Sequence, residues 1–212
     1  MLFRSGAEQH DAVLLCGHST GGLTATLYAA HHPEHPLIKA LWLNSPFYDF
    51  NMHPLKRAFA LPNLSRLGKV FPNLQLPSEL NKWYSASLHK ALKGEWQFNL
   101  DWKKEAYPKV RLSFISAVFE AQKEIHRGVK IDVPALVMHS HQTKNPRKWG
   151  KAAQSSDVIL SVKHIRKYAK KIRGDVTIAE IKNGLHDLVL SEKAARSSVY
   201  RQLFSWLSSK GL

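Results

Sequence analysis

The stretch Ala12-Val13-Leu14-Leu15-Cys16-Gly17-His18-Ser19-Thr20-Gly21-Gly22 decides how this sequence folds. An apolar run over residues 12–16 leads into Gly-x-Ser-x-Gly, and an Ala- and Leu-rich segment continues to His31. This order predicts a strand that turns sharply into a helix and exposes the Ser19 hydroxyl at the turn. The prediction depends on the whole stretch, because a bare Gly-x-Ser-x-Gly often occurs by chance.

The small residues around the serine have a steric role in such a turn. We expect Gly17 and Gly21 to let the strand and the helix approach closely. Together with His18, these glycines form the turn around Ser19, which we call the elbow. The serine backbone itself is then strained. The alternative is that Ser19 only caps a helix after a glycine turn.

Composition indicates a single globular domain with a strong positive charge. The chain has 212 residues, 44% of them hydrophobic, and a formal net charge of +15. A basic surface can attract nucleic acid, anionic head groups or acidic substrates. The densest basic run, Lys163 to Arg173, places Ile165, Tyr168, Ala169 and Ile172 at helical spacing. We therefore interpret it as the solvated face of a helix, with a functional anion-binding patch as the alternative, and we expect no nucleic-acid partner.

The sequence also indicates in which cellular compartment the protein is expected. Cys16 is the only cysteine, so no disulfide forms within the chain and a reducing environment is expected. No apolar run reaches the length of a membrane span, and residues 1–10 lack the core of a signal peptide. We therefore expect a soluble, cytoplasmic protein without a transmembrane segment.

Strand and helix patterns alternate on both sides of a long central segment. Apolar runs predict strands at 12–16, 37–43, 133–139 and 175–181, and a final helix is expected at 191–208 with Ser191 as its N-cap. This alternation predicts an α/β fold with a mostly parallel sheet of about four strands flanked by helices. Residues 1–46 and 129–212 would form this core.

Residues 47–128 have a different character, with frequent prolines and a high density of aromatic residues. Phe114, Val118, Ala121 and Ile125 form a helical stripe late in the segment. We predict a mostly helical cap, or lid, inserted between two strands. Its aromatic residues would form either the core of the cap or the walls of an apolar substrate pocket.

A serine hydroxyl becomes an effective nucleophile when a base removes its proton and a third group orients that base. In proteins that carry such a serine at a strand-to-helix turn, the acid follows the serine in the chain and the histidine comes last. His186 lies in the loop between the last predicted strand and the final helix, so it is the predicted base. The alternative is that His186 is a structural histidine of the loop. His139 and His141, at the end of a predicted strand, are further candidates for the base, but they come too early in the chain.

The orienting acid follows by elimination. Asp157 is the one carboxylate between Ser140 and Gly174. Asp175 opens a strand at the opposite end of the sheet, and Asp187 adjoins the histidine and is expected to point away from it. Asp157 is therefore predicted as the acid, with a helix-terminal aspartate of no catalytic role as the alternative.

No metal or other cofactor is expected. His31, His32 and His35 end a predicted helix, but they lack partners at a recognised metal-ligand spacing. The sequence also has no paired-cysteine site and no glycine-rich phosphate loop.

Together, the segments Leu14–His31, Asp157-Val158-Ile159-Leu160 and Gly184-Leu185-His186-Asp187 resemble α/β-hydrolases of the serine aminopeptidase-like and monoacylglycerol lipase-like (lysophospholipase) branch. The resemblance implies hydrolysis of esters or related acyl compounds, with a small ester or lipid-like substrate. It implies Ser19 as nucleophile, Asp157 as acid and His186 as base. It also implies the Thr20 backbone N–H as one oxyanion donor.

The resemblance also implies several strands before the elbow, and an early loop that supplies a second oxyanion donor. Here residues 1–11 precede the elbow strand, which would become a sheet edge. The expectation is that the chain is part of a longer protein, that another chain pairs with this edge, or that the hydrolase has decayed. The alternative function is therefore an inactive remnant or a binding module for acidic partners.

Overall fold

The computed structural model of the chain describes residues 10–78, 80–102 and 107–212. Its elements are, in chain order, β1 (Val13–His18), α1 (Thr20–His31), β2 (Ile38–Asn44), α2 (Pro54–Val70), β3 (Gln75–Leu76), α3 (Trp83–Ala86), β4 (Val110–Arg111), α4 (Leu112–Arg127), β5 (Ala135–Ser140), α5 (Lys151–Gln154), α6 (Val162–Ala169), β6 (Val176–Ile181), the 3₁₀ helix η1 (Leu188–Leu190) and α7 (Lys193–Ser209).

A four-stranded parallel sheet organises the fold, in the order β1-β2-β5-β6. The short strands β3 and β4 form a separate antiparallel pair. The four strands of the large sheet lie within two residues of their predicted ends. The predicted α/β class and four-stranded parallel sheet are therefore confirmed, and β1 stands at one edge of the described sheet.

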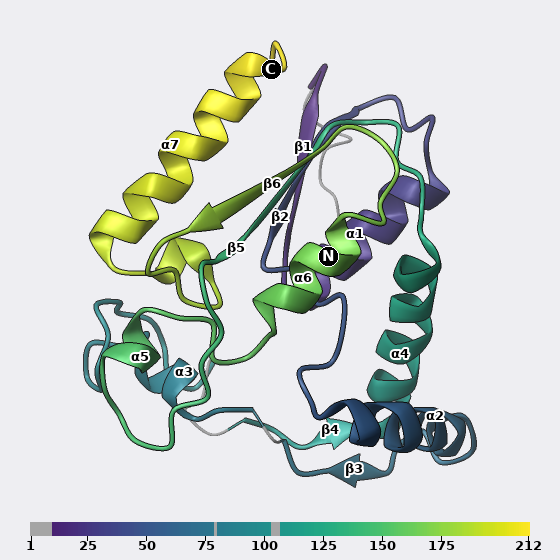
Figure 1. Cartoon of the computed structure of the whole chain (residues 1–212), viewed down its shortest axis with the longest axis vertical. Helices are drawn as coiled ribbons and strands as arrows, with labels where there is room; N and C mark the ends of the chain where they lie inside the picture. The colour runs from purple at the N-terminus through teal and green to yellow at the C-terminus, as the bar shows by residue number, and fades with distance from the viewer. Residues whose placement is uncertain (1–9, 79, 103–106) are drawn as a thin grey trace.

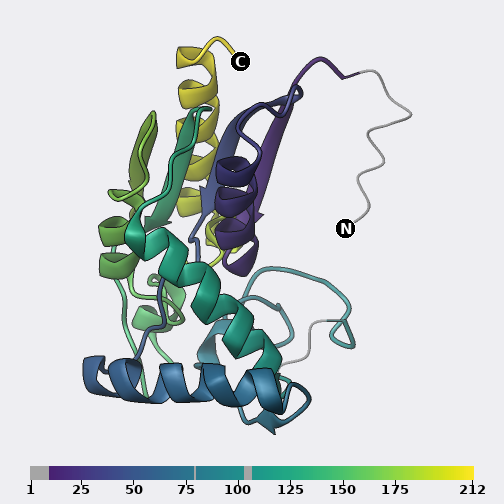
Figure 2. The ribbon, with the colours of Figure 1, turned by 90° about the vertical axis from the view of Figure 1, so that its right-hand side faces the viewer.

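Helices cover both faces of the sheet because each buried strand is apolar on both sides. On β5, Ala135 and Val137 join the cluster that contains α1, α4 and α6 side chains, whereas Leu136 and Met138 join the cluster that contains α7. Figures 1 and 2 show α7 on one side of the sheet and the other three helices on the opposite side. Among the residues described, no helix is long and apolar enough to cross a membrane.

The segment between β2 and β5 extends beyond the carboxyl ends of the strands (Figure 2). Its helices α2 and α4 pack closely at Gly68, where an added Cβ would lie 2.4 Å from the Leu112 carbonyl oxygen. Val118 and Ile125 of α4 are buried in the same cluster as the sheet residue Leu41. The predicted stripe is therefore buried at these two positions, but Phe114 at its start is 44% exposed.

Two local predictions differ from the structure. The basic helix α6 ends at Ala169, and Ile172 reaches the core from the loop that follows. Helix α7 has Glu192, not Ser191, at its N-cap position. The Ser191 hydroxyl instead accepts a hydrogen bond from the Leu185 N–H at 2.8 Å, because the preceding loop folds back onto it.

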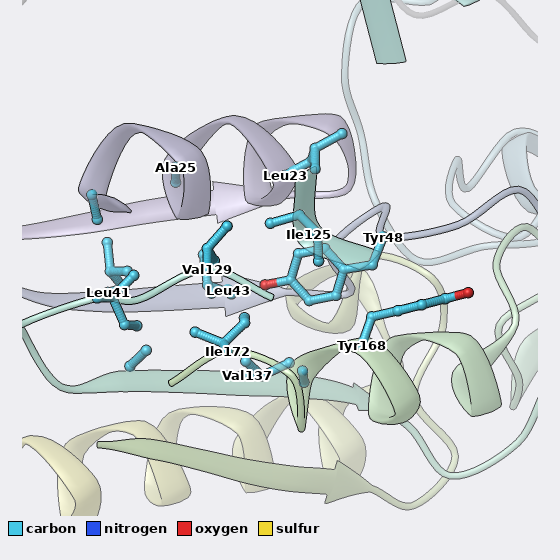
Figure 3. Close-up of a cluster of buried hydrophobic side chains, with 14 of the residues drawn as sticks. Leu23, Ala25, Leu41, Leu43, Tyr48, Ile125, Val129, Val137, Tyr168 and Ile172 are labelled. Atoms are coloured by element: carbon cyan, nitrogen blue, oxygen red, sulfur yellow. The ribbon is translucent and has the colours of Figure 1, made fainter. Parts of the chain in front are cut away.

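A buried tyrosine joins the loop after β2 to helix α1. Tyr48 is fully buried in the cluster of Figure 3, and its hydroxyl lies 2.8 Å from Thr26 Oγ1. Thr26 Oγ1 donates its own proton to the Gly22 carbonyl at 2.7 Å, so the tyrosine hydroxyl is the donor to Thr26. Burial raises the pKa of the Tyr48 hydroxyl, which keeps this donor neutral.

This geometry predicts unequal costs for removing either hydroxyl. Tyr48→Phe should lower the free energy of unfolding by about 0.5–1.5 kcal/mol, because Thr26 keeps its other partner. Thr26→Val should cost about 1–3 kcal/mol, because the tyrosine hydroxyl is then buried without an acceptor. Urea unfolding of both variants measures the difference, and a larger cost for Tyr48→Phe would contradict the assigned donor.

Candidate active site

Ser19 occupies the sharp turn between β1 and α1, with a backbone φ of 54° and ψ of −118°. A positive φ is strained for a non-glycine residue, so surrounding contacts must hold it. The Ser19 N–H donates to the Asn44 carbonyl at 3.0 Å, and the Ser19 carbonyl accepts from the Phe47 N–H at 2.9 Å. The end of β2 and the loop after it therefore hold the strained turn in place.

Close packing at this turn depends on Gly17 and Gly22. A Cβ on Gly17 would lie 2.5 Å from the Gly21 carbonyl oxygen, and one on Gly22 would lie 2.8 Å from Pro46 Cβ. A Cβ on Gly21 would meet nothing within 4 Å. The steric requirement predicted for Gly21 therefore falls on Gly22, since α1 turns this residue towards Pro46.

The loop after β6 brings His186 to the serine. His186 is 3% exposed, and its Nε2 lies 3.0 Å from Ser19 Oγ. Its Nδ1 lies 2.9 Å from Asp157 Oδ2. An ionised carboxylate can only accept, so the neutral ring carries its proton on Nδ1 and leaves Nε2 to accept from the Ser19 hydroxyl.

Asp157 is fully buried in the loop between α5 and α6. Its Oδ1 accepts hydrogen bonds from the Ile159 N–H at 2.8 Å and the Leu160 N–H at 2.7 Å. With the imidazole on Oδ2, both carboxylate oxygens have donors, which compensates for burial of the charge. The same backbone bonds fix the carboxylate's direction.

The other carboxylates considered lie elsewhere. Asp175 lies directly before β6, and its Oδ2 pairs with Lys210 Nζ at 2.5 Å. Asp187 Oδ1 accepts from the Asn44 side-chain amide at 2.8 Å, and Asp187 Oδ2 lies 3.9 Å from His18 Nε2. The structure thus brings Ser19, His186 and Asp157 together and directs Asp187 towards β2.

The alternative histidines have other partners. His139 is buried at the end of β5, and its Nδ1 donates to the Ser140 carbonyl at 2.6 Å. Burial lowers the pKa of its imidazole. His141 Nδ1 accepts from the Asn183 N–H at 3.1 Å. His31 contacts Glu124, and no group of three potential metal ligands occurs among the residues that the structure describes.

Two further residues, His18 and Tyr84, contact His186, and the sequence did not predict these contacts. The His18 ring lies 4.7 Å from the His186 ring, between centroids, and its Nδ1 donates to the Asn44 carbonyl. The Tyr84 ring, from α3, meets the His186 ring edge-to-face with centroids 5.4 Å apart. Burial raises the pKa of Tyr84 well above its usual range, with smaller contributions from Asp187, Tyr107 and Asp157.

A parallel sheet with a strained serine at a strand-to-helix turn, and a histidine and an acid from later loops, defines an α/β-hydrolase. A family model described as serine aminopeptidase, S33, a hydrolase family, matches residues 3–194. The chain belongs to this family. No curated protein matches its sequence.

Solved structures with the same fold include two lipases. The chain aligns with the monoacylglycerol lipase of Paleococcus ferrophilus at 21% identity and a TM-score of 0.67, covering 94% of this chain and 69% of the lipase. It aligns with a soluble variant of the Saccharomyces cerevisiae monoglyceride lipase at 16% identity and a TM-score of 0.63, covering 92% and 64%. The mouse α/β-hydrolase domain-containing protein 10 aligns at 20% identity and a TM-score of 0.54, covering 97% and 65%. This chain therefore spans about two thirds of the length of these proteins.

The two neighbouring glycines of α1 allow a matched test of the turn. Gly22→Ala should lower the free energy of unfolding by about 1–3 kcal/mol, because its methyl group would overlap Pro46. Gly21→Ala should be neutral or stabilise the protein by up to about 1 kcal/mol, because alanine favours a helix. Chemical denaturation compares the two variants, and equal costs would show that the turn is not sterically limited at Gly22.

Proposed function

We propose that this chain is a serine hydrolase that cleaves carboxylic esters through an acyl-enzyme. The proposal is carried by one observation, the continuous hydrogen-bonded path from Ser19 Oγ to His186 and from His186 to Asp157. Its three side chains come from three separate loops at the carboxyl ends of the strands. This is the order of groups that nucleophilic acyl transfer requires.

In the first half of the reaction, His186 Nε2 removes the proton from Ser19 Oγ as the oxygen attacks the ester carbonyl. The tetrahedral intermediate collapses when the imidazolium returns this proton to the departing alcohol. Water then repeats the sequence on the acyl-enzyme, and the free acid leaves. Asp157 holds the neutral imidazole in its Nδ1-protonated tautomer and stabilises the imidazolium that forms, without itself taking up the proton.

The negative charge on the carbonyl oxygen needs donors fixed in advance. We assign the Thr20 backbone N–H as one of them. Thr20 is the first residue of α1, where backbone N–H groups have no partner within the helix and the helix dipole favours negative charge. One such donor contributes about 2.7–4 kcal/mol of transition-state stabilisation.

Residues 47–128 form the proposed cap over the site. Tyr84 contacts His186 from this segment, and Trp96 Nε1 donates to the Leu190 carbonyl beyond the histidine loop at 2.8 Å. The aromatic residues of the cap and the likeness to monoacylglycerol lipases support a small, lipid-like ester as substrate. We also expect a further strand, from this protein or from a second copy, to pair with the outer edge of β1.

Labelling with a fluorophosphonate tests the nucleophile. We expect the probe to modify Ser19, and we expect Ser19→Ala to abolish the reaction. His186→Ala should slow ester turnover by roughly 10⁶-fold, and Asp157→Asn by roughly 10⁴-fold, because the imidazole then loses its correct tautomer. Mass spectrometry of the labelled peptide and hydrolysis of a chromogenic ester measure these effects.

His32→Ala is the matched control, since His32 is an exposed histidine at the end of α1. It should label at the rate of the unmodified protein. Absence of labelling in the folded protein, together with salt-sensitive retention on DNA or anionic lipid, would contradict the hydrolase and support a binding module for acidic partners.

Tyr84 allows a test of the cap. Tyr84→Ala should reduce ester turnover by roughly tenfold or more, because water entering beside His186 weakens its interaction with Asp157. Tyr84→Phe should retain most of the activity, since it keeps the ring. Trp102→Ala removes a 90% exposed aromatic residue of the same segment and serves as the control. A fully active Tyr84→Ala would show that Tyr84 does not shield the site.

A further inference from the structure

Asn44, the last residue of β2, lies between the serine turn and the histidine loop. Its backbone carbonyl accepts two hydrogen bonds from the serine side. One comes from the Ser19 N–H at 3.0 Å and the other from His18 Nδ1 at 3.1 Å. These bonds attach the strained turn to the end of the neighbouring strand.

The side chain of Asn44 reaches in the other direction. Its Nδ2 donates to Asp187 Oδ1 at 2.8 Å, and its Oδ1 accepts from the Leu188 N–H at 3.2 Å. A carboxylate can only accept and a backbone N–H can only donate, so these two partners fix which way the amide points. The two residues directly after His186 are therefore both held by one amide.

Other side chains hold the same loop before the histidine. The Ser140 hydroxyl donates to the Gly184 carbonyl at 2.6 Å, and the Ser191 hydroxyl accepts from the Leu185 N–H at 2.8 Å. Asn44 differs from these serines because it also binds the backbone of Ser19. It is 4% exposed, so an unpaired amide here would be costly.

We infer that Asn44 is a positioning residue that sets the distance between Ser19 Oγ and His186 Nε2. It joins the two loops rigidly, through its carbonyl on one side and its amide on the other. By engaging Asp187, it also keeps a second carboxylate turned away from the imidazole, so that Asp157 remains the partner of Nδ1. This role rests on the proposed hydrolase function, because positioning serves the transfer of a proton between serine and histidine.

The amide of Asn44 and the carboxylate of Asp187 can be exchanged to test this role. Asn44→Asp places a second carboxylate against Asp187 and removes the donor. The double variant Asn44→Asp with Asp187→Asn restores a donor and an acceptor at the same two positions. Asn44→Ser, which is shorter and uncharged, replaces Asn44→Asp if the charged variant does not fold. Asn63→Asp is the control, because Asn63 is exposed and its side chain bonds to neighbours on the same helix, donating to the Phe59 carbonyl at 2.9 Å and accepting from Arg66 at 3.4 Å.

Two readouts are needed for each folded variant. The first is the NMR signals of the His186 ring, assigned by comparison with His186→Gln, which report its surroundings without any substrate. The second is the rate of fluorophosphonate labelling at Ser19. Thermal unfolding confirms that each variant is folded.

We expect Asn44→Asp, or Asn44→Ser, to shift the His186 ring signals and slow labelling by roughly 100-fold, since displacement of a reacting group by about 1 Å has this effect. The exchanged double variant should restore the signals and recover the labelling rate to within about tenfold. Asn63→Asp should change neither. Unchanged His186 signals in a folded Asn44 variant, or failure of the exchange to restore them, would overturn the inference.

The outcomes separate this inference from the proposed function. If the unmodified protein does not label, but the His186 signals shift in Asn44→Asp and return in the double variant, the hydrolase proposal fails and the positioning role stands. If the protein labels normally and Asn44→Asp labels at the same rate, the positioning role fails and the hydrolase proposal stands.

Discussion

The strained backbone of Ser19 is the constraint on which the site depends. A strand and a helix can meet through one residue only where the chain turns sharply, and the left-handed φ of Ser19 makes that turn. Such a conformation persists when its surroundings determine it from several sides. Here the Asn44 carbonyl and the Phe47 N–H bind its backbone, and Gly17 and Gly22 allow the close packing around it. The direction of the Ser19 hydroxyl is thus a consequence of backbone packing.

The features that could be predicted from the sequence are those with a local cause. Apolar runs of strand length and the helical segments between them predict the parallel sheet, because each element needs only its own residues to show its periodicity. The topology then limits the site. The carboxyl ends of parallel strands meet at one edge of the sheet, so Ser19 could be proposed from its Gly-x-Ser-x-Gly stretch, His186 from chain order and Asp157 by elimination.

The details that could not be predicted depend on contacts between distant residues. The Gly-x-Ser-x-Gly pattern singles out Gly21, but the position of Pro46 places the steric requirement on Gly22. Ser191 has the pattern of an N-cap, but the fold brings the Leu185 N–H to its hydroxyl. Asn44 and Asp187 are 143 residues apart and form one hydrogen bond. The sequence around Asn44 does not indicate this partner, because the hydrogen bonds of its side chain depend on the loop that packs against it.

The proposed reactive groups and the side chains around them come from different parts of the fold. The serine, histidine and aspartate belong to loops of the sheet layer, whereas Tyr84 reaches His186 from the segment between β2 and β5. That segment is not loosely attached, since Val118 and Ile125 of α4 are buried in the main core. Tyr84 itself is buried together with Val158 and Leu185, so its position is tied to the loops that carry Asp157 and His186. The hydrogen bonds among Ser19, His186 and Asp157 are thus made by loops of the sheet layer, and a side chain of the intervening segment is buried against two of those loops.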